Sequence, residues 1–253
     1  MAVLTEKQIK YGFDYYHKDD ARPKSVVEVS EYDGEDKLII NCTQLDEGYS
    51  AKDKKRIWLE WCDFLVNNPD AFTELMFCTR MPQELFDAVC AQRRLKKLHI
   101  KWGVYPDISK LESLQELEYL HIGSGRSVSS LEPISRLVNL VALSIENFQQ
   151  IDDYAPLANL KHLESLALEG DFAAPKILKV QSLEFLRHMK QLRFFSLLTA
   201  KVIDKDYSPV LELNNLEHLT LKSCKEVKQL YPQFVKLPKL KYGTVLERPE
   251  LYE

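Results

Sequence analysis

Few residues in this 253-residue chain have types and spacing that could support catalysis or metal binding. Residues 123–127, with the sequence GSGRS, have the glycines of a phosphate loop but lack the lysine that would contact the phosphate. His99 and His121 could share a zinc ion, but they lack the carboxylate or thiolate ligands that would complete a site. No nucleotide-binding, zinc-protease or hydrolase motif is present. The sequence therefore predicts no catalytic residue, no metal site and no cofactor.

Protein binding is the other chemistry that the residue types allow. Lysine, histidine and aromatic side chains gather between residues 97 and 121, and large aromatic side chains are typical interface anchors. With acidic and apolar residues further along the chain, the candidate binding residues are Lys97, His99, Lys101, Trp102, Tyr119, His121, Glu146, Glu169, Phe194, Leu198, His218 and Tyr242. These side chains can bind one partner only if the fold brings them to one surface.

A repeated apolar pattern predicts such a fold. Seven segments carry apolar residues at positions 1, 4 and 6, as Leu95, Leu98 and Ile100 do. The segments start at Phe72, Leu95, Leu117, Leu140, Leu163, Leu192 and Leu216. Successive starts are thus 22 to 24 residues apart, with one step of 29. Because strand side chains alternate, positions 4 and 6 face the core, while positions 3, 5 and 7 face the opposite side. Parallel strands of successive repeats would stack about 4.8 Å apart.

The segments between these strands predict short helical or 3-10 turns. Pro133, Pro156 and Pro209 each precede an apolar residue, and a second apolar residue follows three positions later. Proline is tolerated in the first turn of a helix, where its missing N–H has no intrahelical partner. Short helical segments would therefore close the leucine core from the convex side of a curved solenoid.

The sequence IDDYAPLANLKHLESLAL at 151–168 resembles the repeat of internalin-type bacterial leucine-rich-repeat proteins. The resemblance covers roughly residues 72 to 247. It implies an α/β leucine-rich-repeat solenoid that binds proteins or peptides on its concave strand face. The asparagine usual at position 9 of this family is missing, and the residues there are Arg80, Gly103, Gly125, Phe148, Asp171, Ala200 and Cys224. The turns must therefore satisfy their buried polar groups in another way.

The chain is predicted to contain an α+β N-terminal cap over residues 1–71, seven repeats over 72–239 and a C-terminal cap over 240–253. Residues 25–42 predict a β-hairpin around the Asp33-Gly34 turn. Ser50 is expected to begin a helix whose apolar stripe is Ile57, Trp61, Phe64 and Leu65. A cap would cover the open edge of the first repeat strand. A separate recognition or effector module is the alternative for this region.

Composition excludes several classes of function. The net charge is −4, with 34 basic and 38 acidic residues scattered along the chain, so no basic stripe for nucleic acid is present. No stretch reaches the apolar length of a membrane span, and residues 1–10 do not resemble a signal peptide. The five cysteines are odd in number and form no C-x-x-C pair, which favours free thiols in a reducing compartment. A cytoplasmic location is expected.

The sequence thus predicts a non-catalytic protein that binds another protein on its concave face. The cationic and aromatic residues from Lys97 to His121 favour a partner with an acidic patch. An antagonist role, as a toxin-immunity protein or a secreted effector, is an alternative, and so is a scaffold without a specific ligand. The alternative of a different class is an enzyme with its site in residues 1–71, where His17 is the only histidine.

Overall fold

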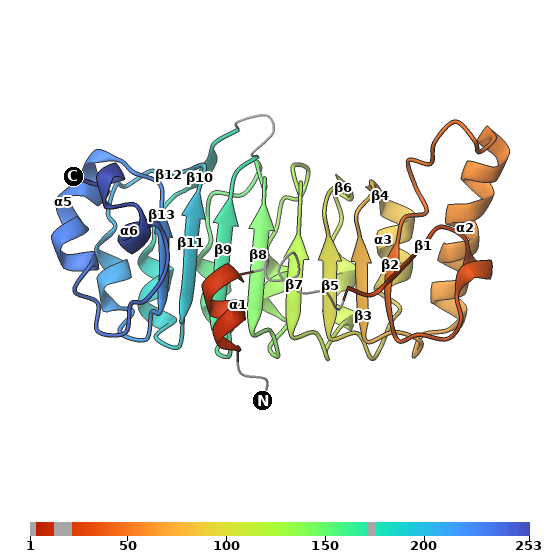
Figure 1. Cartoon of the computed structure of the whole chain (residues 1–253), viewed down its shortest axis with the longest axis horizontal. Coiled ribbons are helices and arrows are strands. Elements are labelled where there is room, and N and C mark those ends of the chain that lie inside the picture. The colour runs from red at the N-terminus through yellow and green to blue at the C-terminus, as the bar shows by residue number, and fades with distance from the viewer. Residues whose placement is uncertain (1–3, 13–21, 172–175) are drawn as a thin grey trace.

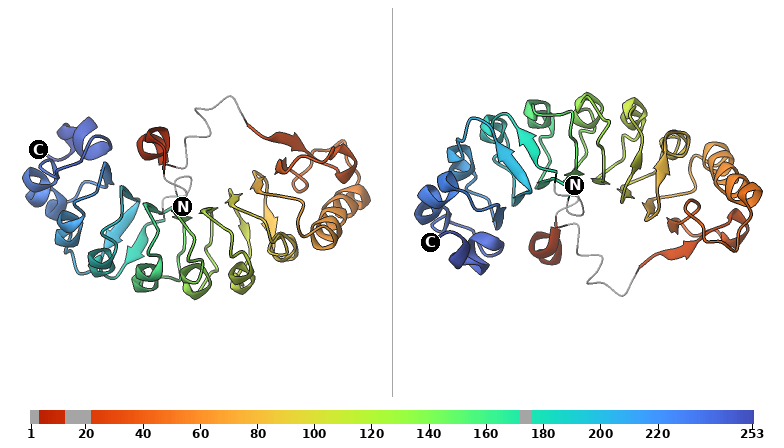
Figure 2. Two further views of the ribbon diagram at one scale, coloured as in Figure 1. Left: turned by 90° about the horizontal axis from the view of Figure 1, so that it is seen from below. Right: turned by 90° about the horizontal axis from the view of Figure 1, so that it is seen from above.

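The computed structural model describes residues 4–12, 22–171 and 176–253. In these ranges the main sheet has nine parallel strands in the order β1-β2-β3-β5-β7-β8-β9-β11-β13. Their bounds are β1 Lys24–Val26, β2 Lys37–Ile40, β3 Glu74–Phe77, β5 Lys97–Ile100, β7 Tyr119–Ile122, β8 Ala142–Glu146, β9 Ser165–Glu169, β11 Phe194–Leu198 and β13 His218–Leu221. The strands follow one another along an arc (Figures 1 and 2). The predicted solenoid with parallel strands on its concave face is confirmed.

The repeat register predicted from the leucines is confirmed by the strand pairing. Leu120 of β7 pairs with Leu98 of β5 on one side and with Leu143 of β8 on the other. Each of these leucines is fully buried, and so is Ile100 two residues after Leu98. Equivalent positions of successive repeats therefore stack into continuous apolar rows, which no single repeat could bury alone.

Short helical segments cover the convex side of the sheet, as the prolines predicted (Figure 2). They are α3 Gln83–Val89, η3 Ser109–Ser113, α4 Glu132–Ser135, η4 Ala155–Asn159, η5 Glu184–His188 and η6 Ser208–Glu212. Two small parallel strand pairs lie beyond the ends of the main strands: β4 Met81–Pro82 with β6 Gly103–Val104, and β10 Leu178–Val180 with β12 Ala200–Val202. Apolar side chains of the convex segments, such as Ile134 and Leu157, are fully buried and close the leucine core.

The hairpin predicted in the N-terminal region is wrong, whereas the helix is confirmed. Strands β1 and β2 pair in parallel, and the 3-10 turn η2, Val29–Glu31, lies between them. Parallel pairing continues from β2 to β3, where Leu38 lies beside Leu75, so β2 extends the sheet in the sense of the repeats. Helix α2, Ala51–Asn67, begins after Ser50, whose hydroxyl accepts a hydrogen bond from the Asp53 amide. The parallel strands and α2 lie at the edge that a cap would have to cover.

The other end of the solenoid is closed by helical segments. Helix α5, Lys225–Phe234, is followed by α6, Thr244–Glu247, and by the 3-10 turn η7, Pro249–Leu251. Tyr242 forms a single parallel bridge with His218 of β13, and Val245 is fully buried. Residues after 240 thus contribute to the core, although they form no full strand of the main sheet.

In one of the turns that lack the family's asparagine, a tyrosine supplies the hydrogen bond to a buried backbone carbonyl. Tyr105 is almost fully buried, stacks on the ring of Phe86 at 5.1 Å, and donates its hydroxyl hydrogen to the carbonyl oxygen of Gly123. A buried carbonyl that lacks a partner would be costly, so this bond stabilises the turn after β7. The expectation that turns here use other polar partners is met at this position.

None of the five cysteines forms a disulfide, and burial raises the pKa of the Cys42 thiol to about 12. Among the residues that the structure describes, no helix is both long enough and apolar enough to cross a membrane.

Candidate binding surface on the concave face

The concave face carries a segment from the chain's own N-terminus. Helix α1, Glu6–Tyr11, lies inside the arc of the solenoid and in front of its middle strands (Figures 1 and 2). Leu4 and Ile9 are 4% and 0% exposed. They pack against four side chains that we call the concave floor: Val141, Ala142, Ala167 and Phe194. This apolar cluster is separate from the leucine core on the other side of the sheet.

The sequence LTEKQI at residues 4–9 explains why α1 begins where it does. The Thr5 hydroxyl accepts a hydrogen bond from the Gln8 amide, and the Gln8 side chain accepts one from the Thr5 amide at 2.8 Å. Leu4 before the cap and Ile9 at the fourth helical position have the spacing of a hydrophobic staple. A helix of six residues is far below the roughly 12–15 residues at which isolated helices become stable. Helix α1 therefore depends on its contact with the concave floor.

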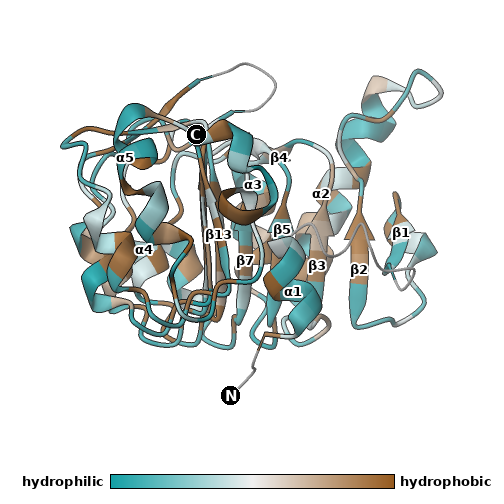
Figure 3. Ribbon diagram, turned by 60° about the vertical axis from the view of Figure 1, so that its left-hand side comes forward, coloured by the Kyte–Doolittle hydropathy of each residue, from teal (hydrophilic) through white to brown (hydrophobic). Residues whose placement is uncertain are grey.

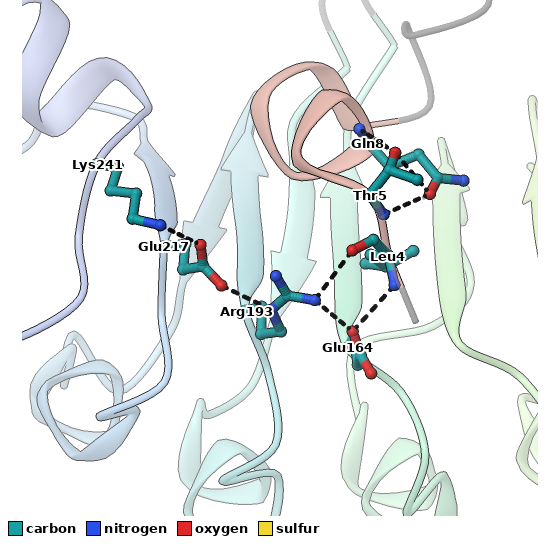
Figure 4. A network of polar contacts seen from close by, with 7 residues as sticks. All are labelled: Leu4, Thr5, Gln8, Glu164, Arg193, Glu217 and Lys241. Atoms are coloured by element: carbon teal, nitrogen blue, oxygen red, sulfur yellow. Dashed lines mark hydrogen bonds and ion pairs between the residues drawn. The ribbon is translucent and has the colours of Figure 1, made fainter. Parts of the chain in front are cut away.

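Four charged side chains form a row beside the floor, three at position 2 of the last three repeats and one at the equivalent place in residues 240–253. We call Glu164, Arg193, Glu217 and Lys241 the charged rim. Arg193 lies 2.9 Å from Glu164 and 2.7 Å from Glu217, and Lys241 lies 2.9 Å from Glu217 (Figure 4). Opposite charges alternate along the row, so each carboxylate has a cationic partner.

The charged rim also holds the backbone of Leu4 (Figure 4). Arg193 donates a hydrogen bond to the Leu4 carbonyl at 3.1 Å, and the Leu4 amide donates to Glu164 at 3.4 Å. Position 2 of the preceding repeat is the apolar Val141, which belongs to the floor. The charged rim thus ends where the Leu4 side chain packs on the floor. The ion pair of Glu164 and Arg193 binds both polar groups of the Leu4 backbone.

The C-terminal end of the solenoid contacts α1 from the other side. The Tyr242 hydroxyl donates to Glu6 at 2.7 Å, and the Lys10 ammonium lies 5.7 Å from the centre of the Tyr242 ring. Gly12 follows the helix with a φ of +55°, and a Cβ there would press against the ring of Phe194. Glycine is therefore required at this position both by the backbone conformation and by the close approach.

The structure brings most of the predicted binding residues together on this face. Lys97 lies 5.5 Å from the centre of the Tyr119 ring, His99 and His121 stack at 4.2 Å, and the rings of Phe194 and His218 are also 4.2 Å apart. Glu146 and Glu169 are register partners at the far ends of β8 and β9. The members outside these pairs are Leu198 at the end of β11, Tyr242 beside β13, and Lys101 and Trp102 just after β5.

In the middle of the face, the concave positions are buried rather than open to solvent. Phe194 is 6% exposed and His218 is 8% exposed, although both point away from the leucine core. The reason is tertiary: α1 covers the strands from which they project. Lys97 is also 8% exposed, and its ammonium lies 3.6 Å from Glu74 and over Tyr119.

Burial reduces the cationic character predicted for the first part of the face. It lowers the pKa of His121 to about 4 and the pKa of Lys97 to about 7. His121 is therefore neutral at pH 7, and its ring nitrogen Nδ1 lies 3.0 Å from the Ser144 hydroxyl. Burial, with Glu169 nearby, also raises the pKa of Glu146 to about 7. Lys101 remains exposed to solvent.

Candidate metal ligands do not cluster in the described part of the chain. Within residues 4–12, 22–171 and 176–253, no group of three or more His, Cys, Asp or Glu side chains is placed to hold a metal ion. His17, on which the enzyme alternative depended, lies outside the described residues.

Sequence reasoning missed α1 and the charged rim. The signal for α1 was present: a capping box, Thr5-x-x-Gln8, flanked by Leu4 and Ile9. The signal for the charged rim was also present, as charges of alternating sign at position 2. The prediction considered only the strand positions that face the core or the concave side. The docking of α1 had no local signal, because Leu4 and Arg193 are 189 residues apart in the sequence.

No family model and no curated protein sequence matches this chain. Among solved structures, an internalin from Listeria monocytogenes aligns with a TM-score of 0.51 and 17% identity, covering 81% of this chain and 51% of the internalin. This chain thus spans about half the length of that protein. A leucine-rich-repeat protein from Leptospira interrogans aligns with a TM-score of 0.40 and 14% identity, covering 86% of this chain and 74% of that one. With the repeat register and the parallel sheet, the alignment to the internalin identifies the fold as a leucine-rich-repeat solenoid.

Proposed function

We propose that this protein is a non-catalytic binding module that recognises a segment of another protein on its concave face. The observation that carries the proposal is the docked N-terminal segment. A peptide segment of this chain already lies on the face, with two apolar side chains on the concave floor and its backbone bound by the charged rim. Leucine-rich-repeat solenoids present such a concave face as an extended binding surface.

Aromatic and histidine side chains among the candidate binding residues support the same proposal. Tyr119 and Tyr242 are partly buried against the floor, and His99, His121 and Trp102 are each half-buried. Aromatic side chains with partly exposed surfaces are typical anchors of protein interfaces.

An acidic patch on the partner would face the exposed Lys101. An antagonist role or a secreted effector would use the same face, and a cytoplasmic location fits the free cysteines.

Replacing Ala167 with arginine is expected to abolish capture of the partner. Ala167 lies in the concave floor at 7% exposure, and an arginine there would occupy the space in which Leu4 and Ile9, or the side chains of a partner, pack. The leucine core would be unaffected, because Ala167 projects from the opposite side of β9. The measurement is affinity capture from extracts of the native cell with quantitative mass spectrometry, where the partner should fall at least tenfold, about 1.4 kcal/mol.

The matched control is Ala155→Arg. Ala155 lies in the preceding repeat, in the convex turn η4, where it is exposed. This variant should capture the partner as the unaltered chain does. Equal capture by Ala167→Arg and the unaltered chain would show that the concave face is not the binding surface.

A further inference from the structure

We propose that the concave floor binds the capped first turn of a partner's helix, and that residues 4–12 occupy this site until such a partner displaces them. The inference rests on the proposed function, since it names the segment that the concave face recognises. The surface consists of the concave floor, the charged rim and Tyr242. The partner is an amphipathic helix that begins at this surface.

The apolar part of the site defines two residues of the partner. Leu4 precedes the N-cap and Ile9 is the fourth residue of the helix, and both side chains are buried on the concave floor. The capping box turns the chain so that these two positions face the same way. A partner helix therefore needs an apolar residue directly before its cap and a second one five positions later.

The polar part of the site fixes the orientation of the segment. Glu164 and Arg193 bind the amide and the carbonyl of Leu4, which every residue except proline offers. Tyr242 donates to Glu6, the first residue of α1. The recognised segment thus has six residues in the order of residues 4–9. It begins with an apolar residue, then Ser or Thr, then an acidic residue. The next residue is unrestricted, Gln or Glu follows it, and a second apolar residue ends the segment.

Residues 4–12 are built to leave the site without unfolding the solenoid. Leu4 and Ile9 belong to the concave cluster and to no part of the leucine core. Helix α1 is too short to persist once it leaves the floor. Its remaining residues are mostly hydrophilic, as the teal colour along most of the α1 ribbon in Figure 3 shows. Release therefore exposes the concave floor and leaves the nine-stranded sheet of the described residues intact.

A peptide competition in trans tests this inference. The probe is the synthetic peptide LTEKQIKYG, residues 4–12, acetylated and carrying a fluorophore at its C-terminus. It is titrated by fluorescence polarisation with the full chain and with the full-length Ile9→Asp variant, whose own segment can no longer bury residue 9. We expect at least tenfold tighter binding to Ile9→Asp, because a tethered segment competes at an effective concentration of about 1 mM.

The controls separate docking from general effects of an added charge. Val66→Asp introduces the same carboxylate at an exposed position of α2, 54% exposed, and should bind the peptide as weakly as the unaltered chain. A peptide with aspartate in place of Ile9 should not bind either chain. If melting curves show that Ile9→Asp is misfolded, Ile9→Ser, which brings no charge, takes its place.

Three results would overturn the inference. Equal peptide affinity for the unaltered and the Ile9→Asp chains would show that α1 does not block the site. Absence of binding to both chains at 1 mM peptide would show that the floor does not recognise such a helix. Dimerisation of Ile9→Asp in sedimentation experiments would assign the exposed floor to a second copy of this chain. Each result leaves the Ala167→Arg capture experiment unaffected, so failure of the inference and failure of the proposed function are distinguishable.

Discussion

Replacing Leu143 with aspartate is expected to unfold the protein. Leu143 is fully buried in β8, with Leu120 and Leu166 as register partners on both sides. An unpaired carboxylate in this row would cost more than about 4 kcal/mol, a large part of the roughly 5–15 kcal/mol by which a typical domain is stable. The loss spreads along the chain because each repeat is stabilised by its neighbours. Circular dichroism during urea unfolding measures the effect.

The matched control for this substitution is Val138→Asp. Val138 lies five residues earlier, near the end of the preceding repeat, and is 50% exposed, so the new carboxylate would stay in water. Its unfolding midpoint should lie close to that of the unaltered chain. Equal midpoints for Leu143→Asp and Val138→Asp would show that the repeat register is wrong.

Replacing Gly123 with alanine is expected to destabilise the protein by about 3 kcal/mol. A Cβ at Gly123 would overlap the carbonyl group of Lys101 in the adjacent turn, which is backbone and cannot rotate away. The Gly123 carbonyl also accepts the hydrogen bond from the buried Tyr105 hydroxyl, so a shift of this turn would disturb both contacts. Urea unfolding of the variant gives the free energy difference.

Gly48→Ala provides the comparison for the glycine experiment. A Cβ at Gly48 would meet only the flexible carboxylate of Asp46, at 3.1 Å, so its effect should stay within about 0.5 kcal/mol. A Gly123→Ala variant as stable as Gly48→Ala would mean that the turn after β7 has room for a side chain. The missing lysine already argued against a phosphate loop in the GSGRS segment, and the structure gives Gly123 a packing role instead.

The leucine pattern predicted most of the solenoid because its signal is local and periodic. Leu98 and Ile100 face the core through strand alternation alone, and the same rule holds for every repeat. The parallel pairing of β1 and β2 was not predicted, because the Asp33-Gly34 pair is a strong hairpin signal. The direction of these strands is set by the pairing of β2 with β3. These two strands are more than 30 residues apart in the sequence, so a local turn signal does not reveal their pairing.

The sequence predicted on which side of the sheet the candidate residues lie, but not how deeply they are buried. Alternation correctly placed Phe194 and His218 on the concave side, yet it says nothing about what covers them. Leu4 reaches Glu164 across 160 residues of sequence, and such a contact leaves no periodic trace. Burial of Lys97 and His121 likewise depends on neighbours from other repeats, so formal charges overstated the cationic character of the face.

The most direct measurement of the central claim is hydroxyl-radical footprinting of the chain alone and with the partner obtained by affinity capture. We expect the partner to lower oxidation of the candidate binding residues Trp102, Tyr119, His121 and Tyr242. Oxidation of Trp58 in α2 and Tyr231 in α5, both half-buried outside the concave face, should stay unchanged. Protection of Trp58 or Tyr231, with the four concave side chains oxidised as in the free chain, would contradict the claim that the concave face is the binding surface.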